Sequence, residues 1–166
     1  RGLMGDCEHS ANPVGRILLA LHGEQDAAAC AAADALCSAL QVLNHLQDCG
    51  EDYRTLDRIY LPQDWMAAEG ARDEDLAGKA LTPALRRVQD RCLAATDQLI
   101  ARARPLAGLL HDRRIAMESA AIWRIAVALS ATLKRRDALA GRVELSKPRA
   151  LACALGGALA VLLRVA

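Results

Sequence analysis

The sequence has almost no aromatic side chains: Phe is absent, and Trp and Tyr occur twice each in 166 residues. Runs rich in β-branched and aromatic residues, which are typical of strands, are also missing. Ala and Leu dominate instead, and both favour helices. The composition therefore argues against a sheet-based fold and predicts an all-α protein.

The charge balance has no dominant sign, with Lys+Arg 21 against Asp+Glu 20 and a net charge of +1. This balance gives no bulk attraction to nucleic acid, so we expect no nucleic-acid partner. A hydrophobic content of 53% with 25% charged residues excludes an intrinsically disordered chain. The length suits one hydrophobic core, and we expect a single helical domain over residues 1–166.

Motifs for zinc, redox or nucleotide chemistry are also missing. There is no CxxC or HExxH pattern, the four histidines are dispersed and are interpreted as structural or surface residues, and Gly156-Gly157 is no dinucleotide fingerprint. We therefore expect no NADPH requirement. The polar N-terminus shows no signal peptide, and we interpret the cysteines as reduced thiols of a cytoplasmic protein. The cysteines are Cys7, Cys30, Cys37, Cys49, Cys92 and Cys153.

Helical periodicity, together with Pro and Gly residues that begin or end helices, divides the chain into segments. Ser10 or Asn12 is expected to cap a first helix with Pro13 in its first turn. Pro62 is expected to lie in a loop or extended segment. The predicted helices run from Pro13 to Gly23, over residues 25–50, from Gln63 to Gly70, from Thr82 to about Arg104, from Pro105 to about Arg136, and from Ser146 onward.

The C-terminal run "ALACALGGALAVLLRVA" is close to the lower length limit for a bilayer span and contains a Gly pair in its middle. We therefore interpret it as a buried helix. Peripheral contact with a membrane is the alternative, because the upstream stretch "KRR" could meet anionic lipid headgroups.

The acidic stretch "NHLQDCGEDYRTLDRIYLP", residues 44–62, begins in the last turns of the long predicted helix and continues beyond it. Asp48 and Asp52 are one helical turn apart, so their carboxylates could converge, with Asn44 one turn earlier. Hard oxygen donors of this kind suit Mg²⁺. A solvated acidic patch neutralised by Arg54 and Arg58 is the alternative, and spacing alone leaves both open.

The same helix carries a polar stripe, and its other faces carry Leu36, Leu40, Leu43 and Leu46 for packing. Such a stripe on a mostly apolar helix predicts an internal cavity. The stripe consists of Cys30, Asp34, Cys37, Gln41, Asn44, Asp48 and Asp52.

The acidic stretch resembles the second aspartate-rich motif of the squalene/phytoene synthase family. Upstream, "CEHSANPVGR" resembles the family's Ser-Ala-x-Pro-Val-Gly helix, and "LSKPRAL" extends the resemblance to the end of the chain. Within the family, residues 36–62 look most like the bacterial hydroxysqualene synthases of hopanoid biosynthesis.

The resemblance implies an isoprenoid-synthase helical bundle with a central cavity and Mg²⁺, or alternatively Mn²⁺, held by two aspartate motifs on facing helices. The implied reaction converts presqualene diphosphate, made from farnesyl diphosphate, to hydroxysqualene with loss of diphosphate. Alternatives within the family are synthesis of presqualene diphosphate, squalene or phytoene from two prenyl diphosphates. An inactive or truncated relative that acts as an interaction domain is the alternative from a different class.

Carried over by motif, Asp48 and Asp52 are the expected metal ligands, and Tyr60 is expected beside the diphosphate as a further catalytic residue. The expected substrate-binding residues are Gln41, Asn44, Glu51, Arg58, Arg142 and Lys147.

Two departures from the family pattern stand out. The first aspartate-rich motif, which lies upstream of the "SANPVGR" helix in the family, is not among these residues. We therefore expect the chain to represent the C-terminal portion of a family member. Asp6 also stands where the family commonly has Tyr, and a carboxylate cannot stabilise a cation through a ring.

Overall fold

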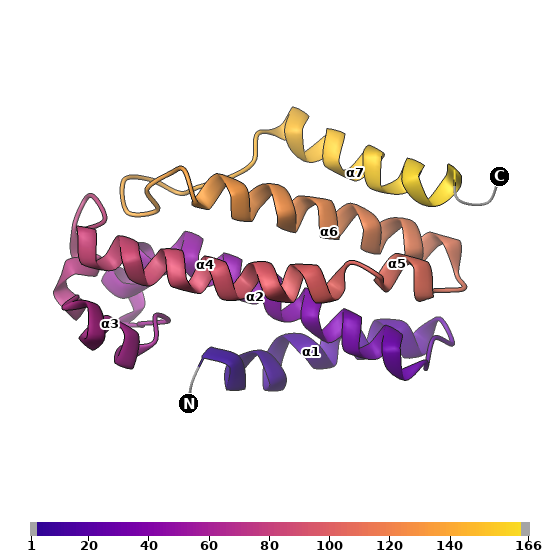
Figure 1. The fold of residues 1–166 in the computed structure, drawn as a ribbon, viewed down its shortest axis with the longest axis horizontal. Helices are drawn as coiled ribbons and strands as arrows, with labels where there is room; N and C mark the ends of the chain where they lie inside the picture. The colour runs from indigo at the N-terminus through magenta and orange to yellow at the C-terminus, as the bar shows by residue number, and fades with distance from the viewer. Residues whose placement is uncertain (1–2, 164–166) are drawn as a thin grey trace.

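A computed structural model describes residues 3–163, with side chains from residue 10 onward, and its regular structure is entirely helical over that range (Figure 1). The all-α prediction is confirmed. The elements are α1 (Leu3–Leu21), α2 (Ala27–Leu56), α3 (Gln63–Glu69), the 3₁₀ helix η1 (Asp73–Ala77), α4 (Pro83–Ala103), α5 (Leu106–Leu109), α6 (Arg113–Leu133) and α7 (Lys147–Leu163).

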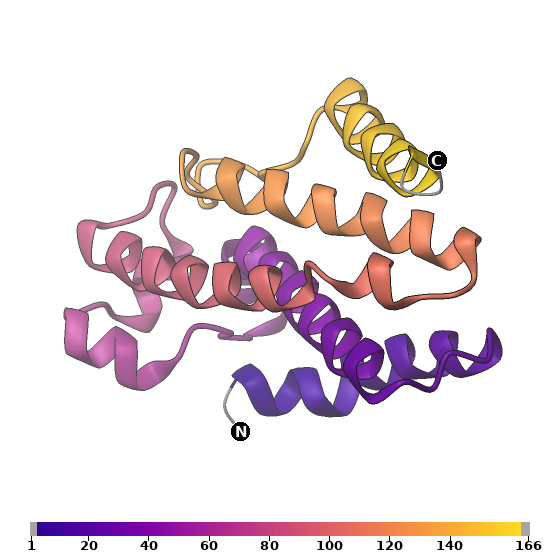
Figure 2. The same cartoon turned by 45° about the vertical axis from the view of Figure 1, so that its right-hand side comes forward.

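The helices pack in the order α1, α2, α4, α6, α7, so that α1 and α7 lie at opposite edges of the molecule (Figure 1). The long helix α2 crosses obliquely behind α4 and α5 (Figure 2). The core consists mainly of leucine and alanine. Its fully buried members include Leu43 and Leu46 of α2, Leu85 and Leu93 of α4, and Leu133 of α6.

Several helix boundaries follow from caps that the sequence indicates. The Thr82 side chain accepts the backbone N–H of Leu85 at 3.2 Å, and Pro83 occupies the first helical position of α4. The predicted helix from Thr82 to about Arg104 is confirmed. The predicted starts of α3 at Gln63 and of α7 near Lys147 are also confirmed.

Three expectations about boundaries are wrong. Pro13 lies inside α1, which begins at Leu3. One missing N–H is tolerated there because residues on either side of Pro13 bond to α2: the Ser38 hydroxyl donates to the Asn12 amide oxygen at 3.0 Å, and Arg16 pairs with Asp34 at 2.5 Å.

The other two corrections concern α2 and α6. Helix α2 continues past residue 50 to Leu56. The expected helix from Pro105 to about Arg136 is two helices, α5 and α6. The Asp112 carboxylate caps α6 by accepting the N–H of Arg114 at 2.7 Å, a side-chain cap that competes with continuation of the helix.

The end of α2 directs the following loop back along the helix. Asp57 has φ 51° and ψ 42°, the left-handed conformation that commonly ends helices. The backbone N–H of Asp57 bonds to the carbonyl oxygen of Asp52, as does the N–H of Arg58 at 3.2 Å. This reversal returns residues 58–62 to the flank of α2.

Candidate functional site

The centre of the candidate site lies between the C-terminal part of α2 and the returning loop. The Tyr60 hydroxyl donates to Oδ2 of Asp52 at 2.7 Å. The Tyr60 ring stacks on His45, with centroids 3.8 Å apart and planes at 15°. One turn earlier, Nε2 of Gln41 lies 3.2 Å from Nε2 of His45. Four polar groups therefore form one continuous string.

The surroundings of Tyr60 keep its hydroxyl protonated. Burial raises the pKa of Tyr60 above its usual range, and the hydrogen bond to the Asp52 carboxylate raises it further. The guanidinium of Arg58 opposes this rise in pKa. Tyr60 is therefore a hydrogen-bond donor near neutral pH, and it holds the Asp52 carboxylate in one orientation.

The Asp48 carboxylate meets a different partner. Its Oδ1 is buried and makes no hydrogen bond within the described residues, and it lies 3.4 Å from Nη1 of Arg142. Arg142 comes from the connection between α6 and α7, and its Nε pairs with Oε1 of Glu144 at 3.0 Å. Asp48 thus has a nearby positive charge but one buried oxygen that accepts no hydrogen bond. Burial of such an oxygen costs folding free energy unless a further partner binds to it.

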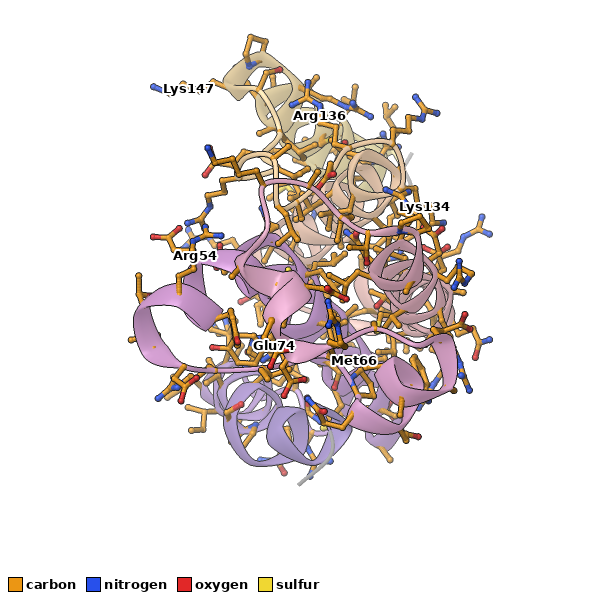
Figure 3. All side chains as sticks on the ribbon, turned by 90° about the vertical axis from the view of Figure 1, so that its left-hand side faces the viewer. Arg54, Met66, Glu74, Lys134, Arg136 and Lys147 are labelled. Carbon is orange, nitrogen blue, oxygen red and sulfur yellow. The ribbon has the colours of Figure 1, made fainter. Side chains whose placement is uncertain are left out.

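The remaining predicted site residues are more exposed to solvent. Asn44, Glu51 and Arg58 are exposed, and Arg58 lies beside Tyr60. Lys147 is exposed at the start of α7 and extends away from the body of the molecule (Figure 3). The structure therefore brings together Gln41, Tyr60 and Asp52, and separately Asp48 and Arg142. Asp6 lies outside the residues whose side chains are described.

His45 is the residue that sequence reasoning missed, because all four histidines were assigned to structural or surface positions. The signal available was its spacing. His45 is one helical turn from Gln41 on the face that leads to the acidic motif, and an aromatic ring there can meet an aromatic residue on a returning loop.

The N-terminal half of the predicted polar stripe is paired with α1. Asp34 pairs with Arg16 at 2.5 Å. Cys37 lies so close to Gly15 that an added Cβ there would be 2.7 Å from its Sγ. These residues of the stripe form a helix–helix interface, and the stripe turns toward the candidate site only from Gln41 onward.

Asp48 and Asp52 have the donor chemistry of magnesium ligands. Among the described side chains, no group of three or more His, Cys, Asp and Glu residues could hold a metal ion. Asp48 and Asp52 nevertheless supply hard carboxylate oxygens, one of them buried without a hydrogen bond. Mg²⁺ commonly uses only one or two carboxylates and completes its shell with water and substrate phosphates, which suits this set.

Comparison with known proteins gives consistent matches. The chain matches the family model for squalene/phytoene synthase over residues 2–149. It is 44% identical over 153 residues to a hydroxysqualene synthase of Rhodopseudomonas palustris, covering 92% of this chain and 52% of that protein. It is 41% identical over 152 residues to a hydroxysqualene synthase of Zymomonas mobilis, with 92% and 51% covered.

A solved structure supports the same relationship. The squalene synthase HpnC from Alicyclobacillus acidocaldarius superposes with a TM-score of 0.74 and 32% sequence identity, covering 80% of this chain and 50% of that one. The chain spans about half the length of the curated relatives it matches. Of the three stretches quoted above, residues 7–16 and 44–62 fall within the matched range, and residues 145–151 overlap its end.

Proposed function

We propose, from the fact that the chain belongs to the squalene/phytoene synthase family, that its protein is a Mg²⁺-dependent isoprenoid diphosphate enzyme. The proposed reaction converts presqualene diphosphate to hydroxysqualene with release of diphosphate. The observation that carries the proposal is the buried, unbonded oxygen of Asp48 beside Arg142, within the family's second aspartate-rich motif. The similarity to two hydroxysqualene synthases supports the choice of product.

In this proposal, Asp48 and Asp52 hold Mg²⁺, with Mn²⁺ as an alternative. Such an ion, when bound, would supply positive charge to the leaving diphosphate. Arg142 and Arg58 bind diphosphate oxygens, for which a planar guanidinium is well suited. Arg142 pairs with Asp48 in the structure, so binding of the cation by Asp48 would leave the Arg142 guanidinium available to the diphosphate.

The string from Gln41 to Asp52 orients the metal-binding side of the site. Tyr60 donates to one Asp52 oxygen, so the other oxygen would be available as a metal ligand. Stacking on His45 restricts the Tyr60 ring, and Gln41 in turn restricts His45. Asn44 and Glu51 support the motif from its exposed side. Lys147 approaches the diphosphate in this proposal only if the start of α7 moves toward Asp48.

In the proposed reaction, water rather than a hydride reacts with the carbocation that forms when diphosphate leaves. The proposal therefore requires no NADPH. Presqualene diphosphate synthase, squalene synthase and phytoene synthase acting on two prenyl diphosphates are the alternatives within the family. A phytoene synthase of Thermus thermophilus is 39% identical over 84 residues, which supports synthesis of phytoene as an alternative.

We propose a cytoplasmic location, with the cysteines reduced. The five described cysteines are free, and Cys7 lies outside the described side chains.

The test is to incubate the full-length protein and Mg²⁺ with presqualene diphosphate, and in parallel with farnesyl diphosphate. Hydroxysqualene from the first substrate, lost on chelation of the metal, is the expected result. Formation of presqualene diphosphate or phytoene would replace the proposed product with one of the alternatives. A folded protein that turns over neither substrate would contradict an enzymatic role and favour an interaction domain.

A further inference from the structure

The connection between α6 and α7 packs on the last turns of α2, beside the acidic motif. Val143 in this connection is buried, and its carbonyl oxygen accepts a hydrogen bond from Nε2 of Gln47 at 2.5 Å. Three residues further along α2, a Cβ on Gly50 would lie 2.5 Å from Cδ2 of Leu139, which also belongs to the connection. These contacts hold the connection against the part of α2 that carries the acidic motif.

The side chains on either side of Val143 point away from the core. Arg142 and Glu144 are both exposed, whereas Val143 between them is buried. Nε of Arg142 pairs with Oε1 of Glu144 at 3.0 Å. The same guanidinium reaches Asp48, with Nη1 at 3.4 Å from Oδ1. Arg142 therefore lies between two carboxylates, one on its own connection and one on α2.

The two contacts of Arg142 differ in closeness. The contact with Glu144 is the shorter, and Oδ1 of Asp48 is buried but accepts no hydrogen bond within the described residues. A guanidinium can donate two parallel hydrogen bonds to one carboxylate, at distances shorter than the contact seen at Asp48. The Arg142–Asp48 pair is therefore held short of the closest arrangement that these two groups can form.

We propose that Glu144 is a positioning residue, which restrains the Arg142 guanidinium and so keeps the Asp48 carboxylate available to a divalent cation. The inference rests on the proposed function, in which Asp48 is a metal ligand. Without Glu144, Arg142 can close on Asp48, and a cation must then displace a complete ion pair. Without Arg142, the cation meets no competing positive charge at this carboxylate. Glu144 thus acts on Asp48 through Arg142.

Other cations also lie near Glu144. Arg136 and Arg149 border the same depression of about 300 Å³ as Glu144. Among the described side chains, however, Arg142 is the cation that pairs with Glu144. The attraction of the Glu144 carboxylate is therefore directed mainly at the guanidinium that also reaches Asp48.

The test is a titration of the full-length protein with Mn²⁺, in which electron paramagnetic resonance measures the free ion. The binding assigned to this site is the share that Asp48→Asn removes. For that share, Glu144→Gln should raise the dissociation constant by about two- to fivefold, and Arg142→Gln should lower it by a similar factor, the size expected of partly exposed ion pairs. In the Arg142→Gln background, Glu144→Gln should have no further effect, because its partner is gone.

The matched control is Glu74→Gln. Glu74 is another exposed carboxylate, on η1, which packs on α2 (Figure 3), and its substitution should leave the dissociation constant unchanged. Arg142 and Glu144 are 53% and 65% exposed, so their substitution leaves the core intact. Circular dichroism verifies the helicity of each variant.

Two results would count against the inference in different ways. If Asp48→Asn leaves Mn²⁺ binding unchanged, the metal site of the proposed function is wrong, and the role of Glu144 is overturned with it. If binding depends on Asp48, but Glu144→Gln has no effect or weakens binding equally with and without Arg142, the role of Glu144 alone is overturned.

Discussion

Asp48 is the residue whose surroundings are the least satisfied in the candidate site. Its buried oxygen lacks a hydrogen bond, and its charged neighbour Arg142 comes from a distant part of the chain. The carboxylate is therefore available to a cation without displacement of a strong hydrogen bond. This is the property expected of a metal ligand, and it distinguishes Asp48 from Asp52, which already accepts a bond from Tyr60.

Replacing Asp48 by Asn removes the negative charge at nearly constant volume. Under the proposed mechanism, turnover of presqualene diphosphate should fall by about 100-fold or more, the size of effect seen when one electrostatic contact to developing charge is lost. Circular dichroism should show unchanged helicity. Glu118→Gln on the exposed side of α6 is the control and should retain activity. Full activity in Asp48→Asn would exclude this residue as a ligand.

His45 is expected to act by positioning Tyr60. His45→Ala removes the stacked ring and should lower kcat by roughly two- to twelvefold, which corresponds to the 0.5–1.5 kcal/mol that an aromatic pair contributes. His45→Phe keeps the stacking and should recover most of kcat. Steady-state kinetics of both variants check this prediction. Equal loss in the Ala and Phe variants would instead point to the imidazole nitrogens.

At the scale of elements, the contact between α6 and α7 depends on one glycine. A Cβ on Gly157 would lie 2.5 Å from the backbone nitrogen of Ala121 and 2.6 Å from the carbonyl carbon of Ala120. Backbone atoms cannot move aside as a side chain can. The neighbouring Gly156 would place its Cβ 2.8 Å from Nη1 of Arg124, the far end of a flexible side chain.

The Gly pair therefore offers a matched comparison. Gly157→Ala should destabilise the protein by about 1–3 kcal/mol, because α7 must shift away from α6. Gly156→Ala should change stability little, since the gain in helix propensity offsets displacement of Arg124. Urea unfolding followed by circular dichroism measures both. Similar midpoints for the two variants would show that the helices do not approach this closely in solution.

At the scale of the whole molecule, a carboxylate links the two turns at one end. Glu24, 3% exposed, follows α1 and accepts the backbone N–H groups of His111 at 2.6 Å and Asp112 at 2.8 Å. The bonds from the Asp112 N–H and then from His111 lower the pKa of Glu24. The bond from His22 at 2.8 Å is the main cause that lowers the pKa of Asp112.

These lowered pKa values predict sensitivity to acid. A carboxylate with a folded-state pKa below its unfolded value stabilises the protein above the unfolded pKa, about 4.3 for Glu, and loses that contribution as pH falls through the folded pKa. Glu24→Gln should therefore unfold at lower urea than the parent protein at pH 7, and the difference should shrink below about pH 4.3. A difference that stays constant down to pH 3 would contradict this assignment.

Much of the fold follows from local signals in the sequence. Thr82-Pro83 starts α4 and Ser146-Lys147-Pro148 opens α7, because caps and first-turn prolines act over a few residues. Periodicity likewise predicts the long helix over residues 25–50, although α2 continues to Leu56. The family resemblance also comes from the sequence, and the match over residues 2–149 confirms it.

The tertiary structure alone decided which of these residues meet. Arg142 reaches Asp48 across the α6–α7 connection, His45 stacks on a loop that Asp57 turns back, and Glu24 ties α1 to the start of α6. No local pattern encodes these contacts, because each depends on how helices distant in sequence pack against one another. The sequence therefore determined the helices and the acidic motif, whereas packing determined the partners that give each carboxylate its chemistry.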